Sequence, residues 1–163
     1  MKQLTIDKTE YTACVFTGHR ELGKDFSPRA LQTAIIECIE KGVTVFYNGV
    51  ARGFDLLAAE AVLNLKKIYD IKLIACVPYY GQERGYNDEE KARYCSILSK
   101  ADEVVVLSEE YYKGCLLRRN DYMVERADCM IAYLSKEQGG TAYTVNKFRK
   151  KKGDNIFFLE KQN

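Results

Sequence analysis

The stretch Asn48-Gly49-Val50-Ala51-Arg52-Gly53-Phe54-Asp55 is a glycine-rich turn between a predicted strand at residues 43–47 and a predicted helix at residues 53–69. A helix N-terminus presents unpaired backbone N–H groups and the positive end of the helix dipole, and glycines let an anion approach them closely. The same arrangement recurs at Gly139-Gly140-Thr141-Ala142-Tyr143, and Thr17-Gly18-His19-Arg20 follows the first predicted strand. Three such turns in one chain predict a phosphate-binding face, and hence a nucleotide or nucleotide-derived ligand.

Apolar runs alternate with amphipathic runs on both sides of that first turn. The predicted strands are residues 12–17, 43–47, 71–77, 103–107, 128–134 and 156–159, and the predicted helices are residues 28–41, 53–69, 88–100, 116–126 and 139–152. This alternation predicts the α/β class: a single Rossmann-like three-layer domain over residues 1–163, with a mostly parallel sheet covered on both faces. Ligands of such folds bind outside the carboxyl ends of the strands, where the strand order reverses. All three glycine turns, and Pro78-Tyr79, follow strands at those ends.

Composition limits the class of protein. The chain has 163 residues, 47% of them hydrophobic, and a net charge of +2, which by itself does not indicate a nucleic-acid or membrane-surface binder. The six cysteines form no C-x-x-C pair and there is one histidine, so we expect no metal site and no required cofactor. Free cysteines, with no signal peptide and no membrane span, predict a cytoplasmic protein without a membrane partner. Cys115 is predicted to be an inert loop cysteine.

Each candidate binding residue has a structural alternative. His19 and Arg20 offer an imidazole and a guanidinium for phosphate, although a loop histidine can serve only local hydrogen bonds. Asp55 could receive a ribose hydroxyl or cap its helix, and the cap is slightly favoured. Arg118 and Arg119 could bind phosphate or form surface salt bridges. A stacking role for Tyr79 competes with local packing.

Taken together, four segments resemble the SLOG superfamily, which joins the Smf/DprA proteins to the Lonely-Guy (LOG) proteins. The chain is most similar to its YpsA-like branch. The segments are Cys14-Val15-Phe16-Thr17-Gly18-His19-Arg20, the turn from Asn48 to Asp55, Pro78-Tyr79-Tyr80-Gly81-Gln82-Glu83-Arg84, and Arg118 to Thr144. The resemblance implies a Rossmann-like fold that binds nucleotides at the face described above. It also implies possible homo-oligomers, which are common in the superfamily.

Comparison with the LOG phosphoribohydrolases implies a catalytic role for Arg119, which stands four residues before Met123 as the LOG arginine does. Gly139 and Gly140 match the glycines of the LOG motif P-G-G-x-G-T-x-x-E. The catalytic glutamate position then falls on Asn146, and an amide cannot replace a carboxylate in stabilising an oxocarbenium-like centre or moving a proton. Other carboxylates that could substitute for it are those of Glu109, Glu110 and Glu125.

The sequence therefore supports three hypotheses. The leading one is a cytoplasmic sensor or regulatory protein that binds a small nucleotide derivative, such as ADP-ribose or another NAD-related species. The alternative is a hydrolase that cleaves the N-glycosidic bond of a nucleotide, related to the LOG enzymes. The third is a module for single-stranded nucleic acid, because the turn from Asn48 to Asp55 is similar to the matching turn of the DprA proteins; this partner is less favoured because the chain has little excess positive charge.

Overall fold

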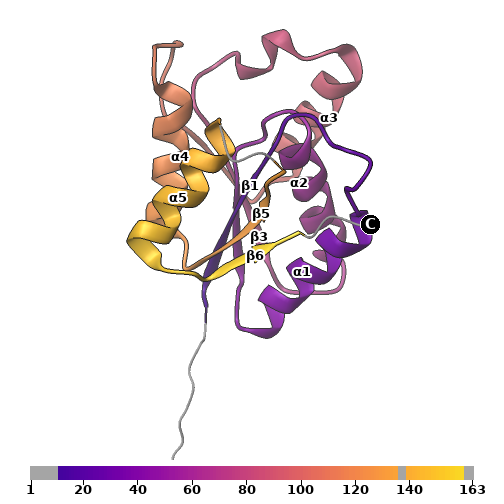
Figure 1. Ribbon diagram of the computed structural model, residues 1–163. Coiled ribbons are helices and arrows are strands. Elements are labelled where there is room, and N and C mark those ends of the chain that lie inside the picture. The colour runs from indigo at the N-terminus through magenta and orange to yellow at the C-terminus, as the bar shows by residue number, and fades with distance from the viewer. Residues whose placement is uncertain (1–10, 136–138, 160–163) are drawn as a thin grey trace, which may run out of the picture.

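The computed structural model describes residues 11–135 and 139–159, and the ends of the predicted domain, residues 1–10 and 160–163, lie outside this range. A six-stranded sheet lies between two layers of helices (Figure 1). The strands are β1 (Ala13–Gly18), β2 (Val45–Asn48), β3 (Lys72–Val77), β4 (Glu103–Val106), β5 (Cys129–Tyr133) and β6 (Ile156–Phe158). The helices are α1 (Pro28–Glu40), α2 (Phe54–Leu65), α3 (Asp88–Lys100), α4 (Cys115–Arg126) and α5 (Gly140–Lys152), with a short 3-10 helix, η1 (Gln82–Gly85).

The strand order is β4-β3-β2-β1-β5-β6, and every neighbouring pair is parallel. The predicted Rossmann-like three-layer α/β fold is therefore confirmed, with a sheet that is entirely rather than mostly parallel. The strand order reverses between β1 and β5, whose register pairs Gly18 with Tyr133 at the carboxyl ends. This reversal is the topological switch point at which doubly wound sheets bind ligands.

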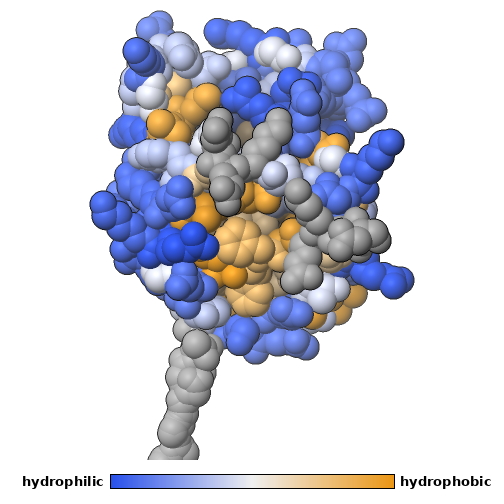
Figure 2. All heavy atoms as spheres, viewed as in Figure 1, coloured by the Kyte–Doolittle hydropathy of each residue, from blue (hydrophilic) through white to orange (hydrophobic). Residues whose placement is uncertain are grey.

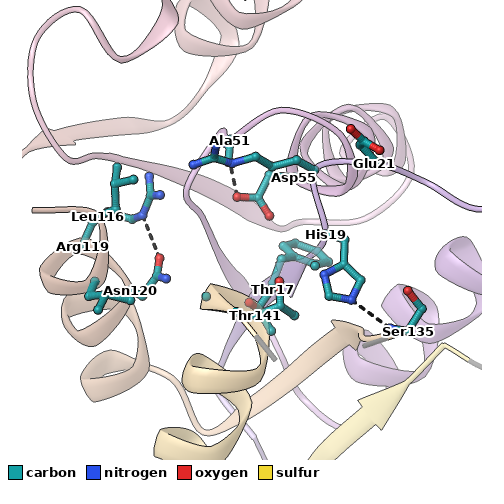
Figure 3. A pocket seen from close by; sticks show the side chains of 16 residues that line it. Thr17, His19, Glu21, Ala51, Asp55, Leu116, Arg119, Asn120, Ser135 and Thr141 are labelled. Atoms are coloured by element: carbon teal, nitrogen blue, oxygen red, sulfur yellow. Dashed lines mark hydrogen bonds between the residues drawn. The ribbon is translucent and has the colours of Figure 1, made fainter. Parts of the chain in front are cut away.

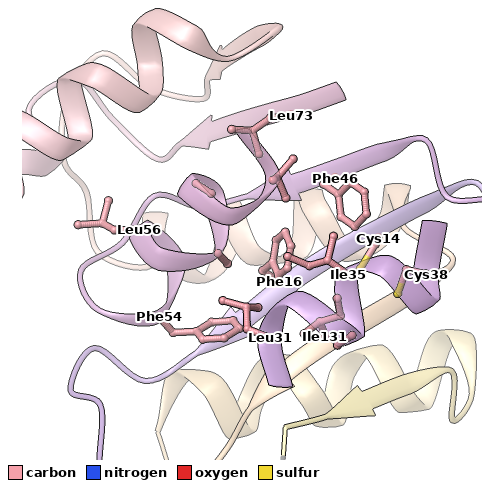
Figure 4. Close-up of a cluster of buried hydrophobic side chains, with 14 of the residues drawn as sticks. Cys14, Phe16, Leu31, Ile35, Cys38, Phe46, Phe54, Leu56, Leu73 and Ile131 are labelled. Atoms are coloured by element: carbon pink, nitrogen blue, oxygen red, sulfur yellow. The ribbon is translucent and has the colours of Figure 1, made fainter. Parts of the chain in front are cut away.

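Two apolar cores hold the layers together, one on each face of the sheet. The larger core packs α1, α2 and α3 against one face, around fully buried rings such as Phe16, Phe46 and Phe54 (Figure 4). The smaller core packs α4 and α5 against the other face, around Met123 and Phe148. Because both faces are covered, the strands are continuous apolar runs rather than alternating ones.

Local sequence signals set several helix ends. The Ser27 side chain accepts a hydrogen bond from the Ala30 N–H at the start of α1, and Asn87 and Glu90 form a capping box at the start of α3. Gly153, at φ +90°, ends α5 as predicted. The sequence did not predict η1, whose four residues are too few for helical periodicity to show. The prediction that Cys115 lies in a loop was wrong, because it is the buried first residue of α4.

Four of the cysteines, Cys14, Cys38, Cys76 and Cys129, are packing residues of the two cores, whereas Cys95 is exposed. Cys14, Cys76 and Cys129 are fully buried, and all six cysteines are free. The Sγ atoms of Cys14, Cys38 and Cys129 lie within 4.8 Å of one another, and burial raises the pKa of the Cys14 thiol well above its usual value. Among the described residues, none of the helices has the length and apolarity that crossing a bilayer requires.

Candidate functional site

A cleft of about 560 Å³ lies at the switch point, beyond the carboxyl ends of β1 and β5 (Figure 3). Its walls come from the segment after β1, the turn after β2, the start of α4 and the start of α5. The residues that line it are Phe16, Thr17, Gly18, His19, Arg20, Glu21, Ala51, Asp55, Leu116, Leu117, Arg119, Asn120, Ser135, Gly139, Gly140 and Thr141. The volume falls within the range of about 300–1,000 Å³ that is usual for small-molecule sites.

The backbone conformation of the turn between β2 and α2 depends on three of its residues, Asn48, Val50 and Gly53. Asn48 is buried and bonds to both ends of the turn: its amide donates to the Asp55 carbonyl and its Oδ1 accepts from the Val50 N–H. Gly53 has φ +75°, and a Cβ there would lie 2.0 Å from the Arg20 carbonyl oxygen. Val50 has φ +48°, which is rare for a β-branched residue, and such strain occurs most often at functional sites.

The segment after β1 is fixed against its neighbours. The Phe54 N–H donates to the His19 carbonyl, and His19 Nε2 accepts a 2.9 Å hydrogen bond from the Ser135 N–H. This acceptor role leaves the imidazole proton on Nδ1. Arg20 is exposed and lines the cleft, so its guanidinium can reach a bound anion. A Cβ at Gly18 would lie 2.3 Å from the Phe54 ring, so only glycine fits between β1 and α2.

Arg119 is the buried cation of the site, only 4% exposed. Its Nη1 donates to the Gly49 carbonyl at 2.6 Å and to the Cys76 carbonyl at 3.2 Å, while its Nε donates to Asn120 Oδ1 at 2.9 Å. Asn120 in turn donates to Thr144 Oγ1 in α5. Burial lowers the pKa of Arg119, although nearby Asp55 opposes this effect. The guanidinium thus joins the turn after β2 and the end of β3 to α4, and Asn120 extends this connection to α5.

Asp55 is the buried carboxylate of the cleft. Its Oδ2 accepts a 3.2 Å hydrogen bond from the Ala51 N–H, four residues before it, so it stabilises the turn. The slightly favoured prediction that it caps α2 is wrong, because Gly53 holds the N-cap position and α2 has no side-chain cap. Burial raises the pKa of Asp55 to about 6, although Arg119, the Ala51 N–H and Arg20 lower it.

A second, smaller cavity of about 230 Å³ adjoins the cleft. Arg20, Ala51, Leu116 and Arg119 line both spaces, and the small cavity is completed by Arg52, Tyr79, Gln82, Gly85 and Tyr86. Gln82 Nε2 donates to the Gly49 carbonyl, which also accepts from Arg119. Gln82 Oε1 is buried and has no hydrogen-bond partner among the described residues.

Most of the residues predicted for binding come together at this site. Those that line the cleft are Thr17, Gly18, His19, Arg20, Asp55, Arg119, Gly139, Gly140 and Thr141. Asn48, Gly49 and Gly53 shape the turn behind it, and Tyr79 lines the smaller cavity. Pro78 is buried and lines neither space, and Arg118 lies outside both, where it donates to the Leu107 carbonyl and the Tyr112 hydroxyl.

The sequence reasoning missed Asn120 and Gln82. Asn120 bonds to the cleft residue Arg119, Gln82 bonds to Gly49 behind the cleft, and neither lies in a glycine turn. The position of Asn120 next to Arg119 was the available signal, since residues i and i+1 on a helix end can share one cavity wall. The signal for Gln82 was a polar residue in a segment that follows a strand end.

Asn146, which the LOG comparison places at the catalytic glutamate, does not line the cleft. It is exposed on α5 and lines a separate hollow with Tyr143, Lys147, Lys150 and Lys151. Glu109, Glu110 and Glu125 are also exposed and line neither the cleft nor the smaller cavity. Among residues 11–135 and 139–159, the carboxylates that line the cleft are those of Asp55 and Glu21.

Comparison with known proteins gives one family. Residues 9–161 match the family described as the YspA SLOG family. A UPF0398 protein of Halalkalibacterium halodurans is 27% identical over 155 residues, which cover 93% of this chain and 82% of the relative. A UPF0398 protein of Bacillus cereus strain Q1 is 27% identical over 135 residues, which cover 81% of this chain and 73% of the relative.

A solved structure shares the fold. DNA processing protein A from Helicobacter pylori, which binds single-stranded DNA, matches with a TM-score of 0.67 and 20% identity. The match covers 93% of the present chain and 66% of that protein, so the present chain spans slightly less than two thirds of its length. At this identity the likeness establishes a common fold.

Proposed function

Because the chain belongs to the YspA SLOG family, we propose that its cleft binds the phosphate and sugar of a nucleotide. One observation carries the proposal: Arg20, Arg119 and the start of α5 converge on one cleft at the switch point of the sheet. The first backbone N–H groups of α5 have no partner within the helix, and its dipole adds positive potential there. Gly139 and Gly140 add no side chain that would keep an anion from these groups.

The proposed ligand is a small nucleotide derivative of the ADP-ribose or NAD type, and the proposed role is that of a cytoplasmic sensor or regulator. The size of the cleft supports this choice, because about 560 Å³ can hold a nucleotide, and the adjoining cavity extends it. Tyr79 and Tyr86 provide aromatic surface there for a base. A required cofactor is not part of the proposal.

Single-stranded DNA is the second candidate ligand. The observation in its favour is the common fold with DNA processing protein A, whose described function is single-stranded DNA binding. Both candidates place a phosphate in the same cleft, and they differ in whether a strand continues beyond it. The hydrolase alternative receives less support, because Asn146 lies outside the cleft and the buried carboxylate within it, Asp55, accepts a hydrogen bond from the turn after β2.

The test is thermal unfolding with AMP, ADP, ATP, GMP, NAD, ADP-ribose and cyclic ADP-ribose, together with fluorescence anisotropy of a labelled DNA strand. A ligand at about 100 times its dissociation constant stabilises the fold by roughly 2.7 kcal/mol. For a chain of this length that corresponds to a rise of about 5–10 °C in Tm. Arg20→Ala is the informative variant, because Arg20 is exposed and lines both cavities.

The matched control is Arg29→Ala, which removes an equal charge from an exposed position that lines neither cavity. We expect Arg20→Ala to abolish or strongly reduce the ligand-induced shift, and Arg29→Ala to leave it unchanged. Equal effects of both variants, or the absence of binding to every nucleotide and to the DNA strand, would refute the proposal.

A further inference from the structure

The last helix carries a concentration of positive charge that the net charge of the chain conceals. Helix α5, Gly140–Lys152, contains one arginine and four lysines and no acidic residue. The rest of the chain has 20 basic and 23 acidic residues, so its formal charge is negative. The overall value of +2 therefore arises from a single helix, and a polyanion would meet a local field very different from that average.

Part of this charge has no carboxylate partner. Lys147 Nζ lies 2.7 Å from Asp121 Oδ2, Arg149 pairs with Asp154 at 2.8 Å, and Lys152 donates to the Glu125 carbonyl. Lys150 and Lys151 are exposed, and in the described part of the chain neither forms an ion pair. Figure 2 shows hydrophilic side chains gathered over the C-terminal half of α5.

The side chains of this helix form a continuous stripe on one face. Tyr143, Asn146, Lys147 and Lys150 are three or four residues apart, so they lie above one another on the helix, and together with Lys151 they line one surface hollow. Tyr143 is 40% exposed, and Lys147 Nζ lies 5.8 Å from the centroid of its ring. Exposed aromatic rings beside lysines are the features that bind single strands without sequence preference.

The stripe begins where the cleft ends. Gly140 opens α5 and lines the cleft, and Tyr143 lies three residues later, about one turn along the same face of the helix. From Thr141 to Lys151 the helix rises about 15 Å at roughly 1.5 Å per residue. A base-stacked strand, at the duplex rise of roughly 3.4 Å per nucleotide, covers that distance with about four nucleotides.

We propose that α5 is a track for single-stranded DNA: one phosphate sits in the cleft, and the strand continues along Tyr143, Lys147, Lys150 and Lys151. This inference rests on the proposed function of the cleft and identifies a strand, rather than a lone nucleotide, as the longer ligand. Charge complementarity and continuity with the cleft select this occupant. Lysines near a helix C-terminus also interact favourably with the negative end of the helix dipole. That interaction does not explain why Lys150 and Lys151 border a surface hollow together with an exposed tyrosine.

The test compares Lys150→Ala/Lys151→Ala with Lys67→Ala/Lys100→Ala, which removes the same charge from exposed lysines of α3 and the segment after α2. Dissociation constants are measured by anisotropy for oligo(dT) strands of about 4 and 12 nucleotides over a salt series, and by calorimetry for the mononucleotide dTMP. Removing one lysine that neutralises a phosphate of a single strand reduces the slope of log K against log salt by about 0.7. For the track variant, the slope of log K against log salt should therefore be smaller in magnitude by about 1.4. The ratio of wild-type to variant affinity should accordingly rise roughly 25-fold when the salt concentration is lowered from about 1 M to about 0.1 M.

We expect dTMP affinity to be unchanged in the track variant and the control variant to bind strands as the wild type does. Tyr143→Ala should weaken strand binding roughly fivefold or more with the same salt slope, because stacking is not ionic. Equal losses in the two lysine variants, no loss in the track variant, or tighter binding of duplex DNA than of the single strand would overturn the track. If Arg20→Ala loses all binding and the track variant binds strands as the wild type does, the proposed track along α5 is refuted and the proposed function of the cleft stands. If the wild type binds no ligand, the proposed function of the cleft is refuted as well.

Discussion

The charge state of Asp55 should set part of the pH dependence of stability. Its pKa rises from the usual 3.8 to about 6 because the carboxyl is buried in the cleft wall. Since the folded-state pKa lies above the unfolded one, the uncharged carboxyl favours the folded state. This contribution is fully present below about pH 4 and is lost as pH rises through about 6.

The perturbation is Asp55→Asn, which keeps an oxygen for the Ala51 N–H and cannot ionise. A shift of about 2 units corresponds to roughly 3 kcal/mol in total, of which about 2 kcal/mol develops between about pH 4.5 and 7.5. The free energy of unfolding of the variant, relative to that of the wild type, should therefore rise by about 2 kcal/mol across this interval. For a chain of this length the Tm difference changes by about 4–8 °C.

Urea unfolding curves at several pH values measure the effect directly. The control is Asp70→Asn, which removes an exposed carboxyl that lines neither cavity. A constant difference between wild type and Asp55→Asn over this pH range would show that the carboxyl is not held in a poorly solvated cleft wall. A difference that falls as pH rises would show that the charged form is stabilised, which contradicts the geometry described above.

Three further predictions concern single residues. Gly53→Ala should destabilise the fold by more than about 1 kcal/mol in chemical denaturation, because φ is +75° and the new Cβ would lie 2.0 Å from the Arg20 carbonyl oxygen; an unchanged midpoint would show that the turn can relax. Asn87→Ala should lower stability by about 1 kcal/mol by removing the α3 capping box, with nucleotide binding preserved as the check on the cleft. Arg119→Ala should cost roughly 3 kcal/mol or more and abolish binding, because it leaves the buried Gly49 and Cys76 carbonyls with fewer donors, whereas Arg118→Ala should do neither.

The fold could be predicted from the sequence because its signals were local and agreed with one another. The apolar run at residues 43–47 followed by the turn at residues 48–55 identified a strand, a turn and a helix. The predicted start of the first helix at residue 28 and the predicted end of the last helix at residue 152 match α1 and α5. The repeated alternation then left a parallel sheet as the consistent arrangement. What periodicity could not supply was the strand order, which places the reversal between β1 and β5.

The site was predicted less completely, since long-range contacts decide what a residue does. Arg118 and Arg119 are neighbours in sequence, yet one is exposed and the other reaches the Gly49 carbonyl, 70 positions away. Aspartate is a common helix cap, but Gly53 holds the N-cap position of α2. The Asp55 carboxylate instead accepts a hydrogen bond from the Ala51 N–H. The basic run at the end of α5 was visible in the sequence, but which of its side chains form ion pairs depends on long-range contacts such as that of Lys147 with Asp121.

The central claim is that a nucleotide phosphate binds where the starts of α4 and α5 meet the segment after β1. The most direct test is two-dimensional NMR of the backbone amides of the isotope-labelled protein during titration with ADP-ribose and with dTMP. We predict that the largest shifts belong to the amides of Gly18, His19, Arg20, Gly140 and Thr141, which line the cleft. Saturable shifts confined to other faces of the molecule, or no shift with either ligand, would contradict the account.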